Sequence, residues 1–340
     1  MTWTYLARRL LLAVVSFFGV LVCTFVLSQV VPGDPAVVAA GRVPDPAVVA
    51  RIRGEMGLDK PLHEQLGIYI SRVLFRLDLG RSVVTKRPVI QDLKRYFPAT
   101  IELVTVSLLF ITVIGLWVGV LSATKRNSPI DHAIRAITLS GISMPEFWLA
   151  IMLQLLFARS LRVLPVDGRV AINVLIGSPL NNGTGFYVLD SLLQGNWRFL
   201  GSSMLHLVLP VFTLTFSLVA YVVRMARAAM LDVLGQDYIR TATAIGLGRR
   251  KVIYKHALRN ALIPILTVIG MVYGFLLGGT VLVELIFSWP GIGRYAADAV
   301  FTMDAPAIMG VTILASMIII SLNLIVDMLC AFVNPAVRYT

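Results

Sequence analysis

Long uncharged stretches recur along the chain and predict membrane-spanning helices. Five of them contain no Asp, Glu, Lys or Arg: residues 10–33, 103–124, 199–223, 260–283 and 305–326. A helix needs about 20 apolar residues to cross a hydrocarbon core of about 30 Å, and each stretch is at least that long. A sixth stretch, 136–158, is apolar but carries Glu146 near its centre. The pattern predicts an all-α polytopic membrane protein with six transmembrane helices.

Composition narrows the class of protein further. The chain has 340 residues, of which 57% are hydrophobic and 14% charged, against about 25% charged in an ordinary soluble domain. The net charge of +12 would favour nucleic acid in a soluble chain, but in an apolar chain it indicates basic cytoplasmic loops. Two cysteines and four histidines show no disulfide or metal-ligand spacing. We therefore exclude a soluble enzyme, a disordered tail and a disulfide scaffold, and expect no cofactor and no nucleic-acid partner.

The positions of the basic residues orient the predicted spans. If both termini are cytoplasmic, the inside segments carry 14 Lys and Arg in 65 residues, and the outside segments carry 16 in 128. The density is about twofold higher inside, and long loops count little toward orientation. We expect both termini in the cytoplasm. The expected division is an N-terminus with the first span (1–31), an extracytoplasmic segment (32–97) and a five-span core (98–340) with a cytoplasmic loop at 224–260.

Two segments are expected outside the membrane. In the first, Asp45 and the following proline predict the start of a short helix over 46–56, and a second helix is expected from Pro61 to about Leu77. The second segment, 159–202, is rich in Gly, Asn and Pro and predicts irregular loop.

The cytoplasmic loop at 224–260 holds eight of the thirty basic residues and also has an ordered pattern. Tyr238, Ala242 and Ile245 recur at helical spacing and predict one shared helix face. Gly246-Leu247-Gly248 then predicts a helix end, because glycine permits a positive φ, and a helix resumes over 249–262. The charge alone would suit anionic lipid headgroups, whereas the helix and break favour docking into a groove on a partner protein.

The same loop resembles the EAA loop of the membrane subunits, or permeases, of ATP-binding-cassette (ABC) importers. Ala242, Gly246 and Leu258 stand in register with that motif, while Arg240, Thr241, His256 and Arg259 depart from it. The segments Asp237–Ala242 and His256–Ala261 are similar to the peptide branch of these permeases.

Further segments carry the resemblance over nearly the whole chain. They are Arg8-Arg9-Leu10, Pro32-Gly33-Asp34-Pro35, Gly57–Pro61, Gly141–Pro145 with Phe147-Trp148, Phe287–Gly293, Asn323, Asp327 and Asn334-Pro335. Within the dipeptide, oligopeptide and nickel transport family, the chain most resembles the first permease subunit of dipeptide importers. The resemblance implies the type I ABC importer permease fold.

The resemblance also implies a heteromeric pump in the bacterial cytoplasmic (inner) membrane. Its other parts would be a second permease subunit, two ATP-binding-cassette ATPase subunits and an extracytoplasmic substrate-binding protein that delivers a small peptide. The sequence has no G-x-x-x-x-G-K-[ST] loop, so we expect a transport subunit in the lipid bilayer, not an enzyme, with ATP hydrolysed by the partners. The expected ATPase-coupling residues are Tyr238, Arg240, Thr241, Ala242, Ile245, Gly246 and Leu258.

An ionisable residue at membrane depth is costly and is therefore a candidate for function. Glu146 follows Pro145 near the middle of the sixth stretch, with Ser143 before it. We expect a kinked helix whose carboxylate lines the path and meets the amino group of a substrate. The alternative is a carboxylate that packs against another helix. Glu102 and Glu284 are expected near the outer ends of their spans, where water reaches them.

Glycines and one tryptophan suggest further contacts. Gly115 and Gly119 form a G-x-x-x-G pattern that favours close helix packing. Gly270, Gly274, Gly278 and Gly279 suit either contact with the paired permease or the lining of the path. Trp289 is expected as an interfacial anchor.

Two other functions compete with the importer permease. A proton-driven secondary transporter would use Glu146 and Asp327 as relays, but it often shows inverted repeats, and none is evident in the sequence. A membrane-embedded enzyme would need a convergent catalytic set, and the four histidines stand in separate segments.

Overall fold

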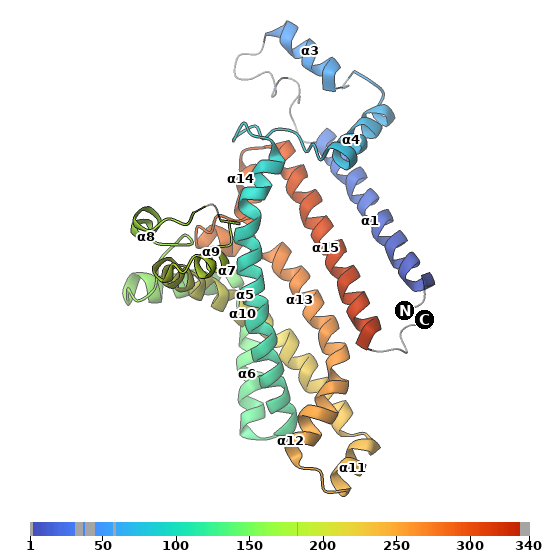
Figure 1. Cartoon of the computed structure of the whole chain (residues 1–340), viewed down its shortest axis with the longest axis vertical. Coiled ribbons are helices and arrows are strands. Elements are labelled where there is room, and N and C mark those ends of the chain that lie inside the picture. Colours follow the sequence, from blue (N-terminus) through green and yellow to red (C-terminus); the bar gives the residue numbers. More distant parts are fainter. Residues whose placement is uncertain (1–2, 31–36, 38–44, 57–58, 182, 334–340) are drawn as a thin grey trace.

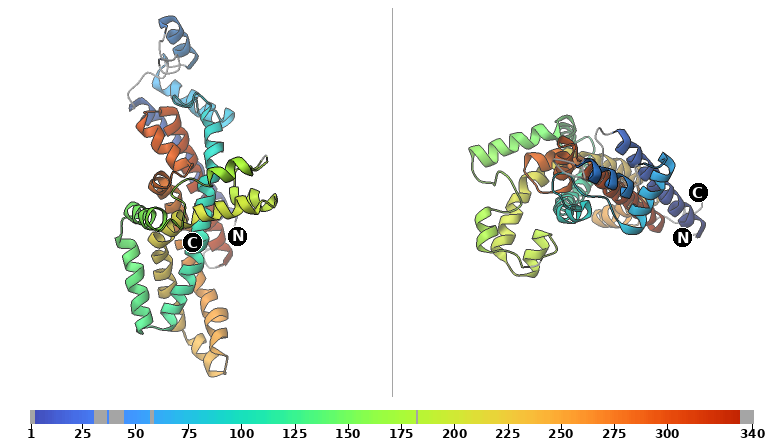
Figure 2. Two further views of the ribbon diagram at one scale, coloured as in Figure 1. Left: turned by 90° about the vertical axis from the view of Figure 1, so that its left-hand side faces the viewer. Right: turned by 90° about the horizontal axis from the view of Figure 1, so that it is seen from above.

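The computed structural model describes residues 3–30, 37, 45–56, 59–181 and 183–333. It shows an elongated bundle of long helices with a lateral arm near mid-height (Figures 1 and 2). Three of the sequence motifs, Pro32–Pro35, Gly57-Leu58 and Asn334-Pro335, lie outside the described residues, as does the side chain of Asp327.

Among the described residues, five helices are long and apolar enough to cross a membrane, which confirms the five uncharged spans. They are α1 (Trp3–Val30), α5 (Val89–Thr124), α10 (Trp197–Leu234), α13 (Leu258–Ile286) and α15 (Ala305–Val333). Helices α5, α10 and α13 form the main core, and α1 and α15 pack beside each other. Helix α5 continues unbroken across residue 97, where the outer segment was expected to end.

Close packing of α5 on α10 depends on two glycines. A Cβ added at Gly115 would lie 2.6 Å from Val222, and one added at Gly119 would lie 2.5 Å from Ala226. Both distances are shorter than any normal carbon contact, so only glycine lets the two helices approach this closely. This confirms the packing interpretation of the G-x-x-x-G pattern.

The sixth span is broken. Helix α6 (Pro129–Ser143) ends before Pro145, and α7 (Glu146–Leu153) with the π-helical segment η1 (Gln154–Ser160) leaves it at 100°. A residue before proline is pushed out of the α-helical region, and Met144 is extended at φ −85° and ψ 129°. The prediction of one kinked helix at 136–158 is therefore wrong, because Pro145 stands between two helices rather than inside one.

The segment expected as irregular loop contains two short helices, α8 (Ile172–Gly177) and α9 (Tyr187–Leu193). Together with α7 they form the lateral arm in Figure 2. The loop prediction is wrong at these two helices because short helices of six or seven residues are fixed by packing more than by their own sequence pattern.

The outer elements follow the prediction more closely. Helices α3 (Pro46–Met56) and α4 (Leu62–Arg76) form as expected, and the Asp45 carboxylate accepts a hydrogen bond from the Ala47 amide at the start of α3. A further short helix, α14 (Ile292–Phe301), lies between α13 and α15. At the opposite end lie α11 (Asp237–Ala244), α12 (Arg249–Lys251) and the π-helical segment η2 (Val252–Ala257).

Candidate functional site: a protruding tip and a broken span

The segment between α10 and α13 forms a protruding tip at one end of the bundle (Figure 1). Helix α11 ends at Ala244, and the chain then turns through Gly246, whose φ is +84°. Helical structure resumes at Arg249 and runs through η2 into α13. The predicted sequence of helix, glycine break and helix is therefore present, and the positive φ explains why glycine stands at position 246.

The two faces of α11 have different surroundings. Ile239 and Ala242 are buried, at 4% and 7% exposure, and pack into the main core. Tyr238 and Ile245 are 43% and 71% exposed. The expectation that Ala242 shares the outward face with Tyr238 and Ile245 is wrong, because Ala242 lies on the side of the helix that the core covers.

The remaining predicted coupling residues divide in the same way. Thr241 and Gly246 are exposed, and the exposed side chain of Arg240 pairs with Asp237 at 3.3 Å. Leu258 is half-buried and packs against the main core where α13 begins. Of the predicted coupling residues, Tyr238, Arg240, Thr241, Ile245 and Gly246 are therefore exposed on the tip, and Ala242 and Leu258 pack against the core.

Hydrogen bonds connect the tip to the spans. The side-chain amide of Asn260, at the start of α13, donates to the Tyr238 hydroxyl at 2.7 Å. The Arg249 guanidinium donates to the Thr124 carbonyl at the end of α5. With the buried contacts of Ile239 and Ala242, these bonds join the tip to α5 and α13 as one piece.

Sequence reasoning missed a charged corner above the tip. Asp131, in the first turn of α6, is fully buried and accepts two hydrogen bonds of 3.0 Å from the guanidinium of Arg227 on α10. The Ser122 hydroxyl at the end of α5 and the Asn127 amide also donate to this carboxylate. The corner therefore fastens α5, α6 and α10 together. An Arg inside a long apolar helix was the sequence signal that could have found it.

At the end of the bundle opposite the tip, Glu284 does not meet water as expected. It is fully buried, and its carboxylate accepts hydrogen bonds from the Thr100 hydroxyl at 2.6 Å and from the Arg294 amide at 2.9 Å. The second bond places a negative charge at the N-terminus of α14, where unpaired amides and the helix dipole stabilise it. A Cβ at Gly291 would lie 2.4 Å from both Glu284 carboxylate oxygens, which explains the glycine in this turn.

Glu102 and Trp289 also differ from their predictions. Glu102 is buried, forms an ion pair with Arg169 and accepts a hydrogen bond from the Val188 amide. Trp289 is completely buried and donates its indole N–H to the Ala99 carbonyl at 2.8 Å, so it is a core residue and not an interfacial anchor. Both residues attach the arm and the α13–α14 turn to α5.

The predicted path residues meet at the break of the sixth span. Glu146 begins α7 directly after Pro145, and Ser143 ends α6. Ser143 and Pro145 are exposed, and the Ser143 hydroxyl donates to the Leu139 carbonyl. One Glu146 oxygen is buried without a hydrogen-bond partner among the described residues. An unpaired buried carboxylate oxygen is costly, so Glu146 differs from Glu102 and Glu284, whose carboxylates accept hydrogen bonds.

The glycine stripe of α13 has two parts. A Cβ at Gly270 would clash with Val326 of α15 at 2.4 Å, whereas Gly274, Gly278 and Gly279 meet no atom within 4 Å in the described part of the chain. Gly270 therefore serves packing within the chain, and the other three leave a smooth strip of α13 open.

Comparison with known proteins agrees with this geometry. The family model described as "Binding-protein-dependent transport system inner membrane component" matches residues 111–339, and its N-terminal companion model matches 2–104. The chain therefore belongs to the family of inner-membrane components of binding-protein-dependent transport systems. This confirms the prediction of a multi-pass transport subunit and not an enzyme.

Named relatives match almost end to end. The probable D,D-dipeptide transport system permease protein DdpB of Escherichia coli is 42% identical over 335 residues, covering 98% of this chain and 97% of the relative. The di/tripeptide transport system permease protein DppB of Pseudomonas aeruginosa is 42% identical over 337 residues, covering 99% of both chains. A solved structure of the MetNI methionine ABC transporter in an inward-facing conformation matches with a TM-score of 0.55 at 18% identity, covering 72% of this chain and 97% of that one. That likeness confirms the type I permease fold.

Proposed function

We propose that this chain forms half of the translocation path of an ATP-driven importer of dipeptides or short peptides. It works with a second permease subunit, two ATPase subunits and an extracytoplasmic substrate-binding protein. The family membership supports the transport class, and the relatives named for dipeptide and di/tripeptide transport support the substrate class.

Both termini and the tip face the cytoplasm in this proposal. Helices α1 and α15 lie antiparallel, so the start of α1 and the end of α15 are on the same side of the bundle, toward the tip (Figure 1). The higher density of basic residues in the segments assigned to that side supports the orientation.

The tip couples the spans to an ATPase. Tyr238, Thr241 and Ile245 supply the docking face for a groove on that subunit, while Ile239 and Ala242 hold α11 against the core. A pull on the docked face is then carried to α5 and α13 through the Arg249 and Asn260 hydrogen bonds. Packed helices that move as rigid bodies about a few hinge residues are a common switching device.

Glu146 serves the substrate in this proposal. A dipeptide carries an ammonium group, and a carboxylate with an unpaired buried oxygen at the break of a span offers that group a charge-assisted hydrogen bond. The exposed positions of Ser143 and Pro145 at the same break leave the backbone accessible beside it.

The observation that carries the coupling proposal is the 71% exposure of Ile245 beside the buried Ala242. Replacing Ile245 with Asp should abolish ATPase binding to the purified permease complex, while membrane insertion stays normal. Thr243 is the matched control, since it is also exposed but lies about 160° around the helix from Thr241, so Thr243→Asp should bind normally. Equal binding by both variants would show that this face is not the docking surface.

A further inference from the structure

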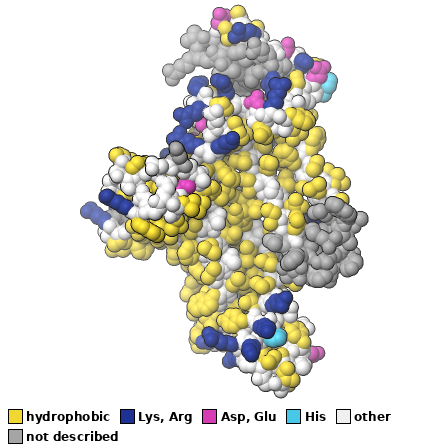
Figure 3. Space-filling view, viewed as in Figure 1, with side chains coloured by type: hydrophobic (Ala, Val, Ile, Leu, Met, Phe, Trp, Pro, Cys, Tyr) yellow, Lys and Arg dark blue, Asp and Glu magenta, His cyan; other side chains and the backbone are white. Residues whose placement is uncertain are grey.

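A cluster of exposed cations lies on the outer side of the molecule, where basic residues are normally sparse. Arg81, Lys86, Arg87, Lys94 and Arg95 are all exposed, and no ion pair is found for them in the part of the chain that the structure describes. We call these five residues the outer basic patch. Figure 3 shows Lys and Arg side chains gathered over the α4–α5 connection and the start of α5.

Two of the four carboxylates near the patch, Asp92 and Asp304, are turned inward. Asp304 is 1% exposed and accepts hydrogen bonds from the Ser82 hydroxyl and the Val84 amide. Asp92 is 2% exposed and accepts hydrogen bonds from the hydroxyls of Thr85 and Tyr295. Asp78 and Asp298 are the exposed carboxylates of the adjoining loop and of α14. Because Asp92 and Asp304 already have partners inside, the face toward water is dominated by cations.

Backbone hydrogen bonds also hold the part of the patch between α4 and α5 in a fixed shape. The Ser82 amide donates to the Arg87 carbonyl at 3.0 Å, the Lys86 amide to the Ser82 carbonyl at 3.1 Å, and the Val89 amide to the Gly80 carbonyl at 3.0 Å. Burial, with the charges of Asp92 and Asp304, raises the pKa of Tyr295, so its hydroxyl stays a neutral donor to Asp92. A preorganised surface loses little conformational freedom when a partner binds.

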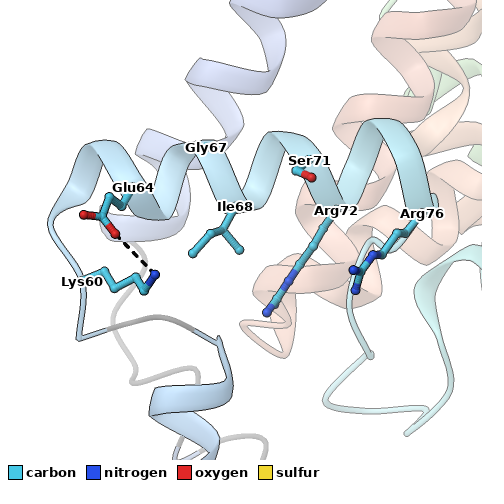
Figure 4. Close-up of a pocket in the computed structure, with 7 residues that line it drawn as sticks. All are labelled: Lys60, Glu64, Gly67, Ile68, Ser71, Arg72 and Arg76. Carbon is cyan, nitrogen blue, oxygen red and sulfur yellow. Dashed lines mark ion pairs between the residues drawn. The ribbon is translucent and has the colours of Figure 1, made fainter.

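The basic surface continues toward α4. A groove of about 500 Å³ runs along this helix. Its lining residues are Lys60, Glu64, Gly67, Ile68, Ser71, Arg72 and Arg76 (Figure 4). Lys60 and Glu64 form an ion pair at 3.4 Å. Arg76 is exposed at the end of α4, five residues before the hairpin of residues 81–88, which carries Arg81, Lys86 and Arg87.

The distance of the patch from the apolar part of α5 shows whether its partner is a lipid headgroup or a soluble protein. The large apolar side chains exposed on α5 run from Leu109 to Trp117, and the uncharged stretch begins at Leu103. At 1.5 Å per residue, Arg95 lies about 12 Å beyond Leu103 along the helix, and the hairpin lies farther out. A headgroup layer is only about 5–7 Å thick, so the cations stand in water above the lipid.

We infer that the outer basic patch is an electrostatic docking surface for an acidic face of a soluble extracytoplasmic protein. On the proposed function, which this inference deepens, that protein is the substrate-binding protein of the transporter. Opposite charges at the rim of an interface chiefly speed association and make binding depend on salt. The patch therefore speeds the association of the substrate-loaded binding protein with the extracytoplasmic side of the permease.

The test uses the whole complex in phosphatidylcholine nanodiscs and the binding protein of the same transporter. The dissociation constant of the two is measured at several NaCl concentrations between low and physiological salt. The triple variant Arg81→Glu, Lys86→Glu, Arg87→Glu should raise the dissociation constant at low salt about tenfold or more and remove its salt dependence. Normal basal ATPase activity of the variant shows that the complex is assembled.

Three other exposed outer cations give a matched control. Arg159, Arg162 and Arg198 lie on the arm and at the start of α10, and their reversal to Glu changes the net charge by the same amount. The control should bind within twofold of wild type. Unchanged binding by the patch variant, or equal weakening by both triples, would overturn the inference. Failure of wild-type peptide uptake would count against the proposed substrate alone, because docking is read without transport.

Discussion

Arg227 on α10 donates two hydrogen bonds of 3.0 Å to Asp131 on α6, one from Nε to Oδ1 and one from a terminal nitrogen to Oδ2. The pair lies at the tip end of the bundle, where α5, α6 and α10 meet. Arg135 comes no closer than 3.8 Å to the same carboxylate, and 45% of its side chain is exposed. The two arginines therefore offer a direct comparison of a buried and a surface partner.

Replacing Arg227 with Ala should strongly destabilise the folded chain. It leaves the fully buried carboxylate of Asp131 without its main partner, and breaking a buried pair in this way costs about 3–5 kcal/mol. Arg135→Ala removes a surface contact worth about 0–1 kcal/mol. Thermal unfolding of the two variants in detergent checks this, and similar unfolding temperatures would show that the corner does not hold the helices together.

Replacing Gly291 with Ala should also destabilise the chain. The new methyl group would stand 2.4 Å from both Glu284 carboxylate oxygens, and overpacking of a buried site typically costs about 1–3 kcal/mol. The matched substitution Gly278→Ala adds the same methyl group where no atom lies within 4 Å in the described chain. A thermal-shift assay should show a loss for the first variant and none for the second.

A large side chain on the open strip of α13, formed by Gly274, Gly278 and Gly279, should affect assembly with a partner and not the fold of this chain. Gly278→Leu meets no neighbour within this chain, so the isolated subunit should fold normally. If the second permease packs on this strip, the variant should weaken co-purification of the two permeases. Intact pairing combined with lost uptake would instead assign the strip to the path.

Glu146 gives a prediction about the substrate. If its unpaired oxygen receives the substrate's ammonium group, Glu146→Asp should keep more dipeptide uptake than Glu146→Leu, since only Asp retains the charge. N-acetylation of the dipeptide removes that ammonium group, so it should abolish the difference between the two variants. Equal uptake of the free dipeptide by both variants would indicate a carboxylate that serves only packing.

The hydrophobic pattern was sufficient to predict the five unbroken spans, because an uncharged stretch of more than 20 residues has few alternatives to a transmembrane helix. The break at Gly246 was also predictable from the sequence, because its positive φ is a local backbone requirement that a single glycine meets. The bend of the sixth span was predicted only as a kink. Its 100° size depends on how α7 packs against α10 and α13, which no local signal carries.

The buried charges show the clearest limit of sequence reasoning. Glu284 and Glu102 stand near the outer ends of apolar stretches, so solvation by water was the natural expectation. Their side-chain partners Thr100 and Arg169 are 184 and 67 residues away, and the distance along the chain hides the pairing. The same is true of Ala242, whose neighbours in the core come from other helices, so its inward direction could not be read from the spacing of α11 alone.

ATP-dependent uptake of a labelled dipeptide tests the central claim most directly. The permease complex, with its ATPase subunits and binding protein, is placed in proteoliposomes, and a protonophore collapses the proton gradient. The account predicts that uptake continues with ATP present and stops without it. Uptake that follows the proton gradient and ignores ATP would contradict the account and favour a secondary transporter with Glu146 as a proton relay.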